Sequence, residues 1–156
     1  MREESTDVVL KKILNSNSLD EVSKITQTTE ATFDKSFTDF FNEYLAKNTE
    51  LVLSDIIKDS GIDKTYAYQM TNGKKTNPGR DYILALCYAA RMNLDEVNHA
   101  LIYSHNGQLH SKITRDANLI FAFSHNNKTK RVKVMDLNEK LSDRDIEPLK
   151  INKGSV

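Results

Sequence analysis

One glycine, Gly61, separates two short segments whose apolar residues repeat with helical spacing. Residues 53–60 form one expected helix before it, and residues 64–71 form another after it. Glycine readily adopts the left-handed backbone conformation that ends a helix and turns the chain sharply. Ile62 can plug the corner, and Asp63 is a good N-cap for the second helix. The sequence therefore predicts two helices that meet across a tight turn.

The second of these helices is expected to have two different faces. Ala67 and Met70 are three positions apart, so they share a face that can be buried against the first helix. The other face offers an amide, hydroxyls and an ammonium, which hydrogen-bond to base edges and phosphates. The candidate DNA-contacting residues are Lys64, Thr65, Tyr66, Tyr68, Gln69 and Asn72 on the helix, and Lys74, Lys75 and Arg80 just beyond it.

Helical periodicity also describes most of the remaining chain. An aromatic stripe from Phe33 to Leu45 is typical of a core helix, and 5 Gly and 2 Pro are too few for the turns of an all-β fold. The fold class is therefore all-α, although residues 131–135 alternate enough to leave a strand open. The other expected helices span residues 7–14, 19–25, 81–92, 94–101, 111–123 and 132–141.

The order of these features between Phe37 and Tyr103 resembles the helix-turn-helix of the phage repressor/Cro-like (XRE-like) family. The likeness includes the Gly61 turn with its apolar plug and cap, a Pro-bearing loop, and a short helix opened by LDEV at residues 94–97. Tyr66 and Tyr68 stand where that family usually has smaller polar groups.

The resemblance implies a lambda-repressor-like five-helix domain whose second motif helix enters the DNA major groove while the first crosses the backbone. Position by position, it implies base or phosphate contacts for Lys64, Thr65, Tyr66 and Gln69. It also implies a phosphate contact for Lys74. Proteins of this kind usually bind paired half-sites as dimers, so a homodimer is one candidate partner, and the sequence does not determine the oligomeric state.

Three parts are expected along the chain. Residues 1–32 form a helical N-terminal arm that ends in a Thr-rich linker, residues 33–103 form the helix-turn-helix domain, and residues 104–156 form a C-terminal helical extension. The apolar stripe at 113–123 within the extension either completes the core or serves as a dimer surface.

The net charge of zero hides an uneven distribution. Residues 1–50 carry a net charge of −4, residues 51–109 carry 0, and residues 110–156 carry +4. An anionic partner should therefore prefer the C-terminal two-thirds, unless the charges are simply spread over solvated faces. The segment 54–80 has a net charge of only +2, which is modest for binding phosphates.

Little in the sequence points to catalysis. Four histidines are separated by 6, 5 and 15 positions, which matches no helical metal-binding pair, and Cys87 is the single cysteine. The five glycines are scattered and form no phosphate-cradling loop. We expect no enzyme activity, metal or cofactor. No apolar run of about 18 residues and no secretory signal is visible, so a cytoplasmic protein without a membrane span is expected.

Two functions remain open. The first is a sequence-specific DNA-binding transcriptional regulator that docks the helix at 64–71 in the major groove of double-stranded DNA. The alternative is an adaptor that uses the same fold to bind a protein and does not bind DNA. The adaptor would use the arm 1–32 and the pair Tyr66 and Tyr68, because tyrosines are frequent in binding hot spots.

Overall fold

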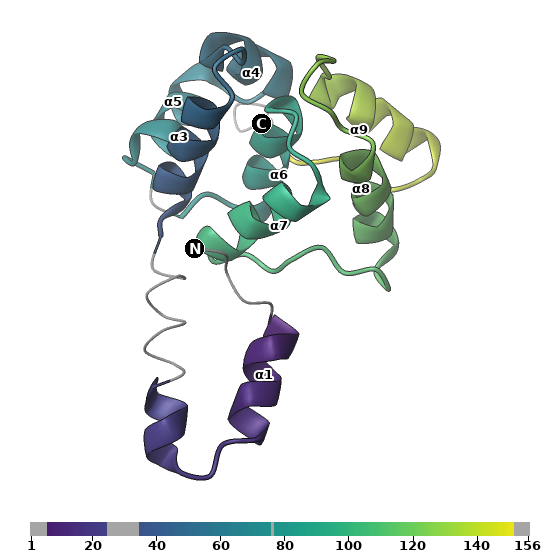
Figure 1. Cartoon of the computed structure of the whole chain (residues 1–156). Helices are drawn as coiled ribbons and strands as arrows, with labels where there is room; N and C mark the ends of the chain where they lie inside the picture. The colour runs from purple at the N-terminus through teal and green to yellow at the C-terminus, as the bar shows by residue number, and fades with distance from the viewer. Residues whose placement is uncertain (1–5, 25–34, 76, 152–156) are drawn as a thin grey trace. The chain divides into compact units, whose positions relative to one another are not determined.

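The computed structural model describes residues 6–24, 35–75 and 77–151 (Figure 1). All regular secondary structure within these ranges is helical, which confirms the all-α class. No helix in the described ranges is both long and apolar enough to cross a membrane. The chain divides into two compact units, residues 1–35 and residues 36–156. The linker expected at 26–32 and the start of the aromatic stripe at Phe33 lie outside the described residues.

The first unit contains α1 (Thr6–Leu14) and a second helical segment at 19–24. Ser18 caps the start of the second segment, because its Oγ accepts a hydrogen bond of 3.2 Å from the amide of Glu21. The Glu21 carboxylate reaches back and accepts a hydrogen bond of 2.8 Å from the amide of Asn17. The large apolar side chains that this unit leaves exposed are Leu10, Leu14 and Leu19.

The second unit contains α3 to α9, all of them short helices. We expected the first to start near Phe33, but it starts at Phe37 because Ser36 caps it by accepting from the amide of Asp39. The segment at 131–135 leads into a helix and not a strand, and Val134 is buried. The helices are α3 (Phe37–Lys47), α4 (Leu53–Ser60), α5 (Lys64–Asn72), α6 (Arg80–Ala89), α7 (Leu94–Tyr103), α8 (Thr114–Ser124) and α9 (Val134–Asp143).

Helix α6 is the centre of this unit. Its residues 83–87 are fully buried, and it packs against α4, α7 and α9. A helix that is apolar on every side must be surrounded by other elements. Cys87 is one of these core residues, and burial raises the pKa of its thiol, so it stays a neutral, small apolar group. The Tyr44 hydroxyl of α3 donates to the Ala90 carbonyl at 2.6 Å, which ties α3 to the end of α6.

The C-terminal extension completes the same core. Leu119 and Phe123 of α8 are fully buried and belong to one apolar cluster with α3–α7. Arg131, just before α9, binds the carboxylate of Asp59 on α4 through two hydrogen bonds of 2.9 Å. Of the two roles considered for the stripe at 113–123, core completion is therefore confirmed for its inner side. The other buried apolar residues of the extension are Leu109, Val134, Leu137, Leu141, Leu149 and Ile151.

Candidate nucleic-acid interface

The turn between α4 and α5 has the geometry expected from the sequence. Gly61 ends α4 in the left-handed conformation, with φ of 72°. Asp63 caps α5, and its side chain accepts a hydrogen bond of 3.1 Å from the amide of Tyr66. A Cβ atom at Gly61 would lie 3.0 Å from the Ile151 side chain, so the turn is also closely covered by the C-terminal segment. Both backbone conformation and available space therefore favour glycine at this turn.

The inner side of α5 anchors the helix to the core. Ala67 and Met70 are fully buried, as their spacing predicts. Two side chains of α3 bind backbone carbonyls near the C-terminal end of α5: the Thr38 hydroxyl donates to Met70 at 3.2 Å, and the Asn42 amide donates to Thr71 at 3.2 Å. These contacts satisfy carbonyls that have no partner within the helix. The outer side of α5 is thus presented by a supported helix.

Most of the candidate residues on α5 lie on its outer side. Lys64, Thr65 and Asn72 are exposed, whereas Tyr68 and Gln69 are half-buried. These side chains supply an ammonium, a carboxamide pair and hydroxyls. The set can donate to phosphate oxygens and can both donate to and accept from a base edge.

Tyr66 differs from the expectation that it projects outward. It is only 7% exposed, and its ring centroid lies 4.5 Å from that of Tyr82 on α6. Burial and the neighbouring Tyr82 raise the pKa of the Tyr66 hydroxyl. Tyr66 is four residues before Met70, so both lie on the inner side of the helix. This i, i+4 relation was visible in the sequence and could have identified Tyr66 as a core residue.

Two exposed lysines follow α5 and are held by short-range contacts. The amide of Lys74 donates to the Asn72 side chain at 2.9 Å, and the amide of Lys75 donates to the Gln69 carbonyl at 3.0 Å. The Lys75 ammonium lies 5.6 Å from the ring centroid of Tyr66. Within the part of the chain that the structure describes, Lys64, Lys74 and Lys75 form no ion pair with a carboxylate. Their charges are therefore available to a phosphate.

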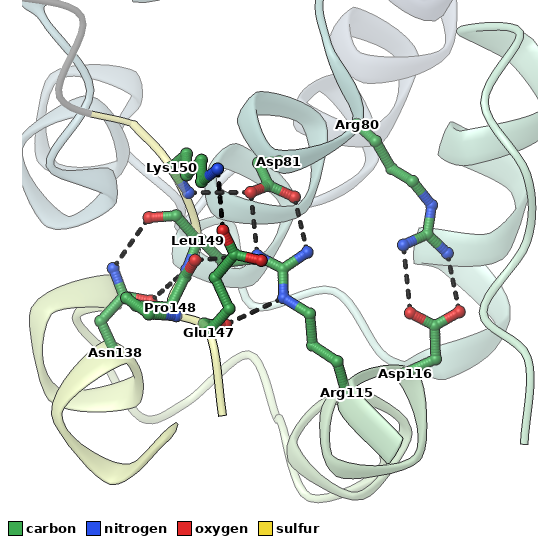
Figure 2. A network of polar contacts seen from close by, with 9 residues as sticks. All are labelled: Arg80, Asp81, Arg115, Asp116, Asn138, Glu147, Pro148, Leu149 and Lys150. Atoms are coloured by element: carbon green, nitrogen blue, oxygen red, sulfur yellow. Dashed lines mark hydrogen bonds and ion pairs between the residues drawn. The ribbon is translucent and has the colours of Figure 1, made fainter. Parts of the chain in front are cut away.

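Arg80 does not join this lysine group, contrary to the expectation that it grips phosphate. Its guanidinium binds both carboxylate oxygens of Asp116 on α8, at 3.1 and 3.0 Å (Figure 2). It also donates to the carbonyls of Gly107 and Gln108, each at 3.1 Å. The Asp116 side chain is 5% exposed. Arg80 therefore neutralises a buried carboxylate, and we remove it from the candidate DNA contacts.

A second ion pair connects the same two helices in the opposite sense (Figure 2). Arg115, next to Asp116, binds both carboxylate oxygens of Asp81, next to Arg80, at 2.9 and 2.8 Å. Arg115 also donates to the carbonyls of Glu147 and Pro148. The Arg of each Arg-Asp dipeptide thus binds the Asp of the other dipeptide, which connects α6 to α8. The bonds from Arg115 also hold the C-terminal segment beside these two helices.

The electrostatics of the two aspartates follow from this arrangement. Burial acts to raise the pKa of Asp81, but hydrogen bonds from the Arg115 side chain and the Lys150 amide outweigh it and lower that pKa. Asp116 responds in the same way to burial and to its bonds with Arg80 and the His110 amide, so its pKa is also lowered. Both groups are therefore held as carboxylates at neutral pH.

The sequence did not predict this network. A signal was present, because the dipeptide Arg-Asp occurs at 80–81, 115–116 and 144–145. The first two dipeptides bind each other, whereas Arg144, which directly follows α9, donates to the carbonyl of Lys140 in the last turn of that helix. The repeat of a dipeptide in the sequence does not predict which of its copies lie in contact in the folded chain.

Comparison with protein-family models, curated proteins and solved structures finds no significant match to this chain. No three His, Cys, Asp or Glu side chains gather as metal ligands within the described ranges. The function is therefore inferred from the residues and their geometry.

Proposed function

We propose that this protein is a sequence-specific, DNA-binding transcriptional regulator of the cytoplasm. Helices α3–α7 act as a helix-turn-helix domain of the lambda-repressor type, and α5 docks in the major groove of double-stranded DNA. The observation that carries the proposal is the outer side of α5. It presents Lys64, Thr65 and Gln69 on a helix whose inner side is fixed in the core.

The side chains divide into two roles. Gln69 is the candidate for reading a base, because a carboxamide can form two hydrogen bonds with adenine. Lys64, Lys74 and Lys75 are the candidates for phosphate contacts, since they are exposed and unpaired with carboxylates in the described structure. Tyr68, Thr65 and Asn72 can contact phosphates or thymine methyl groups at the edge of the groove.

The small number of cations sets the expected strength of binding. Because Arg80 binds Asp116, only three lysines remain as candidate phosphate contacts on this surface. One copy of the protein can therefore neutralise only a few phosphates. Each neutralised phosphate contributes about one unit to the salt dependence of binding. Affinity for random DNA should therefore be weak and should change less steeply with salt than for a protein that makes many phosphate contacts.

A selection from random double-stranded DNA with the pure full-length protein tests the proposal. The enriched sequence is then measured by fluorescence anisotropy at two salt concentrations. We expect one recovered motif and binding that weakens as salt increases. Failure to enrich any motif, together with no binding even at low salt, would reject DNA binding as the function.

Two substitutions test the assigned roles. Gln69→Ala should cost about 1–3 kcal/mol on the selected site and little on scrambled DNA, because it removes a base contact. Lys75→Ala should weaken both DNAs to the same extent, because a phosphate contact carries no sequence information. Lys140→Ala, an exposed lysine of α9, is the matched control and should change neither affinity. Equal losses for Gln69→Ala on both DNAs would contradict the base-reading role.

A protein-binding adaptor is the second candidate, and one observation favours it. The first unit leaves Leu10, Leu14 and Leu19 exposed by 52%, 73% and 84%. Exposed leucines on a small helical unit are typical of a surface that is covered by a partner. The tyrosine pair no longer supports this reading, because Tyr66 is buried. Affinity capture with the full-length chain and with its Leu14→Asp/Leu19→Asp variant tests the adaptor, which requires a partner that the variant loses.

A further inference from the structure

The dipeptide Asn-Gly occurs twice in the chain, at 72–73 and at 106–107. The carbonyl carbon of an asparagine side chain can be attacked by the amide nitrogen of the next residue, and glycine has no side chain that would shield this nitrogen. The two copies have different surroundings in the fold. Asn72 is exposed at the end of α5, whereas Asn106 is half-buried between α7 and α8.

The second copy is held in place by hydrogen bonds. The Nδ2 group of Asn106 donates to the Ser104 hydroxyl at 3.0 Å and to the carbonyls of Ser104 and Pro78, each at 3.3 Å. The following peptide group is also fixed, because the Gly107 carbonyl accepts from the Arg80 guanidinium at 3.1 Å. Attack on the side chain would require rotations that break these contacts. The fold therefore protects this copy.

The first copy has contacts that favour attack on its side chain. The Oδ1 atom of Asn72 accepts a hydrogen bond of 2.9 Å from the Lys74 amide. This donor stabilises the negative charge that develops on Oδ1 when the carbonyl carbon is attacked. Within the described part of the chain the Nδ2 group of Asn72 donates to no acceptor, so it can leave without breaking a contact.

The position of Asn72 at the end of a helix also matters. The backbone at Asn72 must leave the helical conformation before the Gly73 nitrogen can reach Cγ of Asn72. The last residue of a helix makes this change most easily, because helix ends open locally at low cost. The ammonium groups of Lys74 and Lys75, which follow directly, favour the loss of the Gly73 amide proton.

We propose that Asn72 is a site of spontaneous deamidation, which adds a negative charge to this surface with time. The Gly73 nitrogen loses its proton to solvent hydroxide and forms a bond to Cγ of Asn72. The Nδ2 group takes a proton from water, which regenerates hydroxide, and leaves as ammonia. Water then adds to the succinimide ring and breaks one of its two C–N bonds, which gives aspartate or isoaspartate. Water and hydroxide are the only co-reactants.

The product changes the surface at the end of α5 in two ways. A carboxylate now stands two and three positions before Lys74 and Lys75, so it offsets part of their positive charge. An isoaspartate also adds one carbon to the main chain between α5 and the two lysines. Both changes should weaken the binding of an anion. The consequence for DNA rests on the proposed function, whereas the conversion of Asn72 does not.

Peptide mass spectrometry of the full-length protein tests the conversion. After prolonged incubation at mildly alkaline pH, the mass difference between an amide and a carboxylic acid gives the converted fraction at each copy. Asn72 should convert at least about tenfold faster than Asn106, because one hydrogen bond that must be broken contributes about that factor. An equal rate at the two copies, or a faster rate at Asn106, would overturn the inference.

Two controls separate the effect of the fold from that of the local sequence. In concentrated urea the two copies should convert at similar rates, because unfolding releases the Asn106 side chain. Asn72→Gln should abolish the conversion at this position in the folded protein, since a glutamine side chain has to close a larger ring. Conversion of Asn72 in urea but not in the folded protein would mean that α5 protects it, and the inference would fail.

Asn72→Asp carries the aspartate product from the start and tests the consequence for DNA. It should weaken binding to the selected site and to scrambled DNA by the same factor, because a carboxylate repels phosphates of any sequence. Asn127→Asp is the matched control and should leave both affinities unchanged, since Asn127 is also exposed and its Oδ1 accepts from the Thr129 amide at 3.0 Å.

The outcomes of the DNA measurement are distinct from those of mass spectrometry. An affinity of Asn72→Asp equal to that of the wild type would overturn the effect on the surface. Absence of DNA binding by the wild type would instead reject the proposed function, and the ratio of the conversion rates at Asn72 and Asn106 would still decide whether Asn72 is a deamidation site.

Discussion

Lys74, Lys75 and Arg80 lie within seven positions of each other in the sequence, yet the fold uses them in different ways. The two lysines are exposed beside the end of α5, and their charges face solvent. The guanidinium of Arg80 is bound to the buried carboxylate of Asp116 and to two carbonyls. One region is therefore suited to bind an external anion, and the other binds an internal one.

The difference teaches that counting basic residues overestimates a phosphate-binding surface. Arginine presents a planar set of donors that matches a carboxylate through two parallel bonds, and its charge is less strongly hydrated than that of lysine. Partly buried ion pairs in proteins are accordingly often built with arginine, as at Arg80 and Arg115. Lysine is more readily left at the surface, as at Lys74.

The largest expected effect is on the free energy of unfolding of a variant within α5 itself. Tyr66→Ala should lower it by about 3 kcal/mol, because an almost fully buried ring is lost beside Tyr82. Tyr68→Ala is the control on the same helix and should cost about 1 kcal/mol, since Tyr68 is half-buried. Urea denaturation measures both. A similar small loss for both variants would mean that Tyr66 belongs to the outer side after all.

A somewhat smaller loss is expected from breaking the internal ion pair. Asp116→Ala should lower the free energy of unfolding by about 2–3 kcal/mol, because it leaves the Arg80 guanidinium without its carboxylate and the His110 amide without its acceptor. Asp143→Ala, an exposed carboxylate at the end of α9, is the control. It should change the free energy of unfolding by about 0.5 kcal/mol or less. Equal effects of the two variants would show that the Arg80 contact is only a surface contact.

Acid should weaken the internal pairs selectively. The pKa values of Asp81 and Asp116 are lowered in the folded state, so each carboxylate stabilises the fold above its unfolded pKa of about 3.9. That stabilisation is lost as the pH falls through the lower pKa of the folded state. Denaturation between pH 6 and pH 2.5 should therefore show stability falling below about pH 4. The Asp81→Asn/Asp116→Asn variant should lose less stability over the same range, and an equal loss would contradict this origin.

The smallest effect on stability is expected at the lysines. Lys74→Ala should change the free energy of unfolding by no more than about 0.5 kcal/mol, because its side chain is exposed and makes no ion pair in the described structure. If the proposed function holds, the same variant reduces the salt dependence of DNA binding by about one unit. A stability loss comparable to that of Asp116→Ala would remove the contrast between the two regions.

Local features were predictable from the sequence because neighbouring residues determine them. The turn at Gly61 and the Asp63 cap depend on backbone conformation and on one side chain three residues from its partner. The burial of Ala67 and Met70 followed from helical periodicity. Tyr66 is buried as well, because it lies four residues before Met70 on the same side of the helix, although it carries a polar hydroxyl.

The amino-acid sequence by itself determined the helical class, the order of the helices and the bend between α4 and α5, since these rest on propensities and contacts over a few residues. Only the tertiary structure decided that Arg80 binds Asp116 and that Asp81 binds Arg115, each about 35 positions away. It also decided that one side of α8 is buried while the other, with Phe121, faces solvent. The sequence alone would allow many different pairs of charged residues and of apolar residues. Packing around α6 determines which of these residues lie close enough to make contact.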